Sequence, residues 1–186
     1  MAKNSGSTKR VAPNTMSKDE SRDAFSSALG SGNYDISRSY FSEEGNGSVL
    51  FHKGHNIVDS EIEAAKIMAD NGYDVQLTPE NDRRYVKIVK GKDKYVEGTV
   101  SAIEFEQATP NPTNRTVEGR TRSVNKALEH AMGKEADIAL IYDKYNSFHR
   151  EDIDRGIKRF EKLNKHRFKA ILTVNTRREV HEWWHN

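Results

Sequence analysis

Two largely apolar runs in the C-terminal half constrain the fold of this chain more than any other feature. They are ADIALIYD at 136–143 and FKAILTVN at 168–175. Runs of this length without alternation are typical of strands that are covered on both faces. Each run follows a segment with apolar residues at helical spacing, at 121–133 and 151–164. This order of helix, strand, helix and strand predicts a sheet with helices on both faces.

The middle of the chain adds one more helix and several short strands. SVLFH at 48–52 predicts a strand, and EIEAAKIMADNG predicts a helix over about 60–71, with Ser60 and Glu63 as its capping box. YDVQL, RRYVKIVK, KYVEG and TVSAIEFEQ then predict short strands separated by turn residues. The sequence therefore predicts an α/β fold with a mixed central sheet and an α-β-β-β-α-β core.

The first 47 residues differ in composition from the rest. They are rich in Ser, Gly and Asn, and few of them are apolar. Such a segment buries too little surface to offset the loss of chain entropy. We expect residues 1–47 to be a flexible leader with a possible short helix over 19–29, ahead of a domain at 48–186.

Composition excludes several classes of site and of protein. The chain of 186 residues has no cysteine, which excludes disulfide scaffolds, thiolate metal sites and cysteine nucleophiles. No stretch approaches the ~20 apolar residues of a membrane span, and the first residues do not resemble a secretory signal. We therefore expect a cytoplasmic protein. With 30 Lys and Arg against 28 Asp and Glu, total charge identifies no partner.

Carboxylates on the predicted strands are the candidates for chemistry. Glu104 and Glu106 are two residues apart and so lie on the same side of one strand. Asp93 lies just upstream, and Glu63 lies in the first turn of the predicted helix. Converging carboxylates would hold Mg²⁺ or Mn²⁺, which orients water on a phosphodiester. The alternative is a solvated strand edge, an ordinary turn aspartate and a helix cap.

A histidine pair gives a weaker signal. His52 and His55 in HKGH could ligate a metal, but the pair lacks the helical spacing and the third ligand of a zinc site.

The combination of these segments resembles the restriction-endonuclease-like PD-(D/E)xK nucleases. Within them it resembles the C-terminal tRNase-type toxin domain of contact-dependent inhibition proteins and its relatives on phages and mobile elements. The resemblance covers about residues 48–180 and lies in FHKGHN at 51–56, SEIEAAKIMADNGYDVQL at 60–77, KDKYVEG at 92–98, IEFE at 103–106, TRSVNKALEHA at 121–131, ADIALIYD at 136–143 and DIDRGIKRFEKLNKHRFKAILTV at 152–174.

The resemblance implies roles for individual residues. Asp93 matches the motif aspartate, Glu104 the second acid, and Glu63 or Glu61 the helix glutamate, which together would bind Mg²⁺ or Mn²⁺. Glu106 stands where the family has a lysine that activates water. By this resemblance the site is inactive unless another residue does the work of the missing lysine. The candidates are Lys126 and, second to it, Arg122 on the second helix, together with Gln107 and Glu106 on the strand.

Basic residues crowd the second and third predicted helices. The candidates for contact with a phosphate backbone are Arg120, Arg122, Arg155, Arg159 and Lys162. Acids interleave with these cations, so a solvated helix face with internal ion pairs is an equal alternative.

The sequence thus favours a metal-dependent nuclease that acts on tRNA or DNA. An immunity protein or a phage particle would be its possible partner, and no membrane is involved. The alternative is an inactive nuclease fold that serves as a binding module or a phage structural accessory. A junction resolvase on the same scaffold is a third hypothesis, and the oligomeric state is left open.

Overall fold

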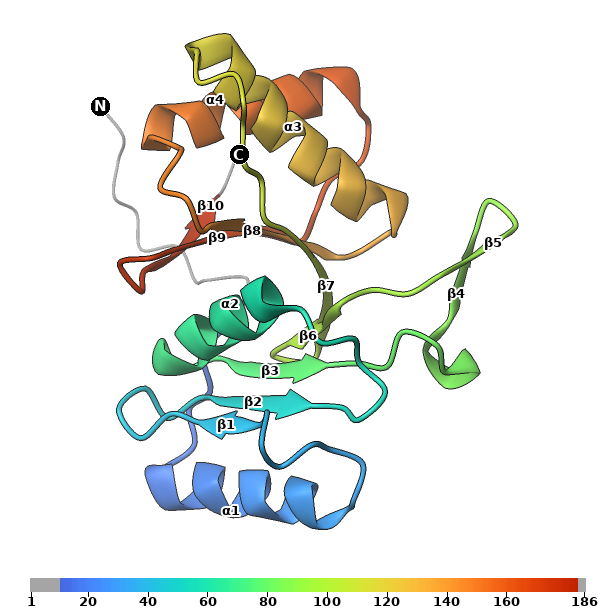
Figure 1. Cartoon of the computed structure of the whole chain (residues 1–186), viewed down its shortest axis with the longest axis vertical. Coiled ribbons are helices and arrows are strands. Elements are labelled where there is room, and N and C mark those ends of the chain that lie inside the picture. Colours follow the sequence, from blue (N-terminus) through green and yellow to red (C-terminus); the bar gives the residue numbers. More distant parts are fainter. Residues whose placement is uncertain (1–10, 184–186) are drawn as a thin grey trace.

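The computed structural model describes residues 11–183, which form an eight-stranded mixed sheet and a separate hairpin (Figure 1). The strands lie in the order β1 (Tyr40–Phe41), β2 (Ser48–Phe51), β3 (Asp74–Leu77), β6 (Gly98–Val100), β7 (Ile103–Ala108), β8 (Ile138–Asp143), β9 (Ala170–Asn175) and β10 (Val180–Trp183). Strand β2 pairs in parallel with β3, and β7, β8 and β9 form a parallel set. Antiparallel β6 joins the two sets. The predicted mixed sheet is confirmed.

Helices cover both faces of this sheet, as the sequence predicts. Helix α2 (Asp59–Asp70) packs on one face through Ala64, Ala65 and Met68. Helices α3 (Val117–Gly133) and α4 (Arg150–Leu163) cover the other face over β7, β8 and β9 (Figure 1). Every residue of β8 is buried, which explains why its sequence shows no alternation.

The predicted capping box of α2 is wrong. The helix begins at Asp59 with Val58 at the N-cap, and no side chain caps it. Ser60 therefore lies inside the first turn, where its hydroxyl is too late in the chain to accept from the first free N–H groups. Glu63 turns instead toward β8 and lies 3.1 Å from Lys144 Nζ.

Residues 11–47, expected within a leader, lie against the sheet. Helix α1 (Lys18–Gly30) begins at a capping box of Ser17 and Glu20 and lies beside β2 (Figure 1). Strand β1 extends the sheet by pairing with β2. Val11 is fully buried in the core cluster under α2. Residues 1–10 of the predicted leader lie outside the described residues.

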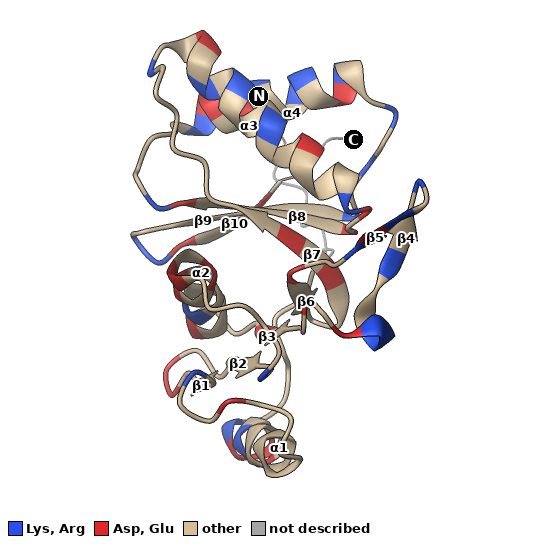
Figure 2. Ribbon diagram, turned by 45° about the vertical axis from the view of Figure 1, so that its right-hand side comes forward, with Lys and Arg blue, Asp and Glu red and all other residues tan. Residues whose placement is uncertain are grey.

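The segment between β3 and β6 leaves the sheet and returns to it. A short 3₁₀ turn, η1 (Arg83–Tyr85), precedes β4 (Lys87–Val89) and β5 (Lys92–Lys94), which pair only with each other. The strand predicted over 83–90 is therefore shorter than expected, because the Asp82 side chain accepts from Arg84 N and holds the first residues in a turn. The hairpin projects from the body in both views (Figures 1 and 2).

None of the helices within residues 11–183 is long and apolar enough to cross a membrane.

Candidate metal centre

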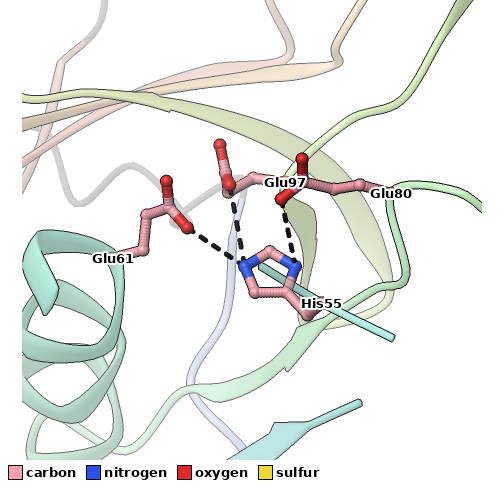
Figure 3. A group of neighbouring side chains, drawn as sticks. All are labelled: His55, Glu61, Glu80 and Glu97. Atoms are coloured by element: carbon pink, nitrogen blue, oxygen red, sulfur yellow. Dashed lines mark hydrogen bonds and ion pairs between the residues drawn. The ribbon is translucent and has the colours of Figure 1, made fainter. Parts of the chain in front are cut away.

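One group of potential metal ligands stands out among residues 11–183. It contains His55, Glu61, Glu80 and Glu97, each of which offers a ligand atom within 4.8 Å of the others (Figure 3). The group lies just beyond the carboxyl ends of the parallel strands β2 and β3. In open α/β sheets this edge is where ligands usually bind.

His55 is the buried centre of the group. Its side chain is 0% exposed, and its ring packs edge-on against Phe51 with centroids 5.2 Å apart. Nδ1 lies 2.7 Å from the carbonyl oxygen of Thr78, and since a carbonyl only accepts, Nδ1 carries the proton. This leaves Nε2 to face the carboxylates. A backbone carbonyl that orients a histidine in this way is typical of metal sites.

Two carboxylates face Nε2 of His55 and a third faces Nδ1 (Figure 3). Nε2 lies 3.0 Å from Glu61 Oε2 and 3.8 Å from Glu97 Oε1. Glu80 Oε1 lies 3.7 Å from Nδ1. Because an imidazole lone pair cannot approach a carboxylate lone pair without a proton or a metal ion between them, the Nε2 side is arranged for a cation.

The pKa values of the group reflect this crowding. Burial, together with the nearby charges of Glu61 and Glu106, raises the pKa of Glu97 to about 9. Burial lowers the pKa of His55, but hydrogen bonds to Glu61 and to the Thr78 carbonyl outweigh burial and raise it above its ordinary value. Without a metal ion, protons on His55 and Glu97 therefore offset part of the negative charge of the group. With a metal ion, its positive charge replaces them, so this His/Glu group can hold a metal ion.

The projecting hairpin brings two of the four ligands together. Glu80 precedes the hairpin and Glu97 follows it, and the backbone N–H of Thr78 donates to the carbonyl of Glu97 at 3.1 Å. This bond closes the base of the hairpin. Helix α2 supplies Glu61 from its first turn, and the turn after β2 supplies His55.

Glu106 and Gln107 lie next to the centre on opposite faces of β7. One oxygen of Glu106 accepts from Glu97 N at 3.0 Å, and the other lies 2.8 Å from His130 Nε2. Gln107 Nε2 donates to the carbonyl of Ser60 at 3.1 Å, which ties β7 to the start of α2. Both side chains are buried, and both support segments that carry metal ligands.

The structure does not bring the other sequence-predicted site residues into this group. Glu104 pairs with Lys87 at 2.6 Å on the same face of β7 as Glu106, as expected from their spacing. Glu63 contacts Lys144 and Tyr142, and Asp93 lies exposed on β5 of the hairpin. Lys126 lies on the exposed side of α3. Glu61, the alternative to Glu63 in the sequence, is the helix glutamate that faces His55.

The basic residues of α3 and α4 are largely engaged with two acids. Arg120 and Arg155 lie 2.7 and 2.6 Å from the buried carboxylate of Asp152. Arg122 and Arg159 both contact Glu118, at 2.8 and 3.0 Å. Lys162 is exposed and has no ion-pair partner among the described residues. This arrangement is that of a helix face with internal ion pairs.

Sequence reasoning missed Glu80 and Glu97 and underrated His55. A usable signal was present, because both glutamates flank a segment with a Gly turn and alternating strands, which has to return to where it left the sheet. HKGH also lacked a visible third ligand, since the acids near His55 come from later segments of the chain.

Neither a protein-family model nor a curated protein matches the chain. Among solved structures, the chain is similar to one described as "CdiA-CT/CdiI toxin and immunity complex from Burkholderia pseudomallei". The sequence identity is 13% over 74% of this chain and 98% of that chain, with a TM-score of 0.49. A likeness of this degree does not establish a shared function.

Proposed function

We propose that the protein hydrolyses phosphodiester bonds of tRNA or DNA at a metal centre formed by His55, Glu61, Glu80 and Glu97. The observation that supports this proposal is the convergence of one oriented imidazole and three carboxylates at the carboxyl edge of parallel strands. A bound Mg²⁺ or Mn²⁺ would supply a polarised water and offset negative charge on a phosphodiester oxygen.

The ligand types favour Mn²⁺ over Mg²⁺. Carboxylate oxygens suit both ions, but an imidazole nitrogen suits Mn²⁺ better, because Mg²⁺ is harder and prefers oxygen ligands and water. We therefore propose that the centre binds Mn²⁺ more tightly than Mg²⁺.

The exposure of each glutamate indicates its role in the proposed reaction. Glu61 and Glu97 are mostly buried and face Nε2, so their role is to hold the ion. Glu80 is the most exposed of the four, with 29% of its side chain accessible, and so it can accept a proton from an attacking water. Glu106 acts as a positioning residue, since it holds the backbone of Glu97.

Cleavage assays with two glutamates of the same helix test the proposal. Glu61→Gln should lower Mn²⁺-dependent cleavage of tRNA or DNA by about 100-fold or more, because a metal ligand is lost. Glu63→Gln, two residues away, and Asp93→Asn should cleave like the wild type. The reverse pattern would instead support the set of Glu63, Asp93 and Glu104 that the resemblance implies. If the wild type cleaves neither tRNA nor DNA with any divalent ion, the proposed nuclease activity is excluded.

A binding module without catalysis is the second candidate. The observation that favours it is that both oxygens of Glu106 are engaged, by Glu97 N, His130 and Lys134. By the sequence resemblance, Glu106 also stands where a nuclease would have its lysine. Calorimetric titration separates the two candidates, since a binding module need not take up Mn²⁺, whereas the nuclease requires it. We also propose, from the sequence resemblance alone, that the domain acts as a toxin held inactive by an immunity protein.

A further inference from the structure

The projecting β4–β5 hairpin is a strongly charged segment that the metal centre does not use. Residues 82–94 contain six Lys or Arg residues against two acids. In Figure 2 the basic residues follow both strands of the hairpin. The face formed by α3 and α4 also carries cations, but four of its arginines already contact Glu118 or Asp152.

Most of the hairpin cations have no acidic partner. Arg84 pairs with Asp82, and Lys87 pairs with Glu104. Among the residues that the structure describes, no ion pair involves the other four cations, which are Arg83, Lys90, Lys92 and Lys94. The hairpin therefore presents unneutralised positive charge to solvent.

The lysines gather on one face of the hairpin. Lys87 lies directly opposite Lys94 in the antiparallel register, and Lys92 is two residues from Lys94 on the same strand. Like charges in directly opposed positions destabilise a strand pair. A two-stranded ribbon is also marginally stable by itself. Glu104 already neutralises Lys87 at 2.6 Å, so the lysines that remain for an external anion are Lys90, Lys92 and Lys94.

The turn at the tip is also unfavourable by itself. Lys90 and Gly91 form the two-residue loop, with φ of 49° and 72°. A loop with both φ values positive strongly prefers Asn or Asp followed by Gly. Lys90, at the first position, places a cation at the tip, although Asn or Asp would adopt this positive φ more easily.

We propose that the β4–β5 hairpin is a nucleic-acid docking arm that grips the phosphodiester backbone and leads it to the metal centre. A two-stranded ribbon fits a nucleic-acid groove, and lysines bind successive phosphates as point charges. The arm is joined to the centre at both ends, through Glu80 and Glu97. Lys94 is three residues from Glu97, so their Cα atoms lie at most roughly 11 Å apart. The docking itself does not require the metal, but delivery to a cleavage site depends on the proposed function.

Binding assays without metal test the arm separately from the centre. The probes are a labelled single-stranded RNA and a DNA duplex of about 20 base pairs, each titrated in EDTA at several salt concentrations. The test variant is Lys90→Gln, Lys92→Gln and Lys94→Gln combined. The matched control is Lys126→Gln, Lys162→Gln and Lys165→Gln, which removes the same charge from exposed positions on and after α3 and α4.

The hairpin variant should bind at least about tenfold more weakly than the wild type, with the slope of log K against log salt reduced by about 2–3. The control variant should change both quantities much less. Replacement of the same three lysines by arginine should restore binding, which also excludes misfolding as the cause.

Three results would overturn the arm. The first is an unchanged affinity in the hairpin variant, and the second is an equal loss in the control variant. The third is equally tight binding of poly-glutamate, which would identify an acidic protein as the partner. Mn²⁺ titration of the hairpin variant should match the wild type. The experiments therefore distinguish failure of the docking proposal from failure of the metal-centre proposal.

Discussion

His55 shows how a single buried side chain can organise a site. Its side chain has no exposed surface, its Nδ1 lies 2.7 Å from the carbonyl oxygen of Thr78, and its Nε2 faces two glutamates. An imidazole fixed in this way loses little entropy when it binds a cation, because its tautomer and orientation are already set. Such an arrangement is expected of a ligand rather than of a core histidine.

Proton release should accompany metal binding. Since the pKa of Glu97 is raised to about 9, its carboxyl carries a proton at pH 7.5 when no metal is bound. Metal binding requires the carboxylate, so the proton must leave. Calorimetry of Mn²⁺ binding in two buffers of different ionisation enthalpy should therefore show net release, and affinity should rise with pH up to about 9. Binding heats that are independent of the buffer would contradict this.

At the scale of elements, the base of the hairpin is the critical junction of the site. Glu97 is followed by Gly98 on β6, where a Cβ would overlap the backbone carbonyl oxygen of Gln76 on β3. Only glycine permits this close approach of the two strands. The position of Glu97 therefore depends on its neighbour.

Gly98→Ala should separate β6 from β3. We expect a loss of about 1–3 kcal/mol in the free energy of unfolding, because the overlap involves backbone atoms that cannot rotate away. Mn²⁺ affinity should fall as well, since Glu97 moves with the strand. Urea unfolding and Mn²⁺ titration measure the two effects. Gly133→Ala, in the last turn of α3 where a Cβ would meet nothing within 4 Å, is the control and should neither destabilise the protein nor weaken Mn²⁺ binding.

The contact of α3 with α4 depends on a buried aspartate. Burial raises the pKa of Asp152. Hydrogen bonds from the His149 N–H and from the guanidinium groups of Arg120 and Arg155 lower it by a larger amount, so the pKa lies below its ordinary value. A carboxyl with a lowered pKa in the folded state stabilises the fold above its unfolded pKa, and this contribution is lost as the pH falls through the folded value.

Asp152→Asn should therefore destabilise the protein by about 3 kcal/mol at pH 7, where it leaves two arginines without their carboxylate. The difference from wild type should begin to shrink as the pH falls below about 4, and it should vanish only below the lowered pKa of Asp152, where the folded wild-type carboxyl also takes up a proton. Urea unfolding of both proteins at pH 7 and at a pH below about 4 measures this difference in the free energy of unfolding. A pH-independent difference would show that packing, and not charge, explains the effect.

At the scale of the whole molecule, the spacing of apolar residues predicted the features of the fold that depend on local packing. The α/β class, the helices and the buried strands β8 and β9 all follow from runs and spacings of apolar residues. The site does not, because its ligands lie at 55, 61, 80 and 97, and only the closed base of the hairpin brings the last two together. Local patterns favoured Glu104 and Asp93, since adjacency in sequence is visible and convergence through a hairpin is not.

Because the ligands come from four separate segments, metal binding should stabilise the whole fold. An ion that binds only the folded chain at 100 times its Kd adds about 2.7 kcal/mol, or roughly 5–10 °C in Tm for a domain of this size. Thermal melting with and without Mn²⁺ measures this increase, which EDTA should reverse. Glu63→Gln is the control and should respond like the wild type.

Glu61→Gln should reduce the stability gained from the metal. Without metal this variant should melt slightly below the wild type, because it loses the negative charge that lies 3.0 Å from His55 Nε2. With Mn²⁺ the wild type should be the more stable protein by a larger margin, since the variant has lost a ligand. A variant that melts well below the wild type without metal, and that gains as much from Mn²⁺, would show that Glu61 supports the fold and does not bind the ion.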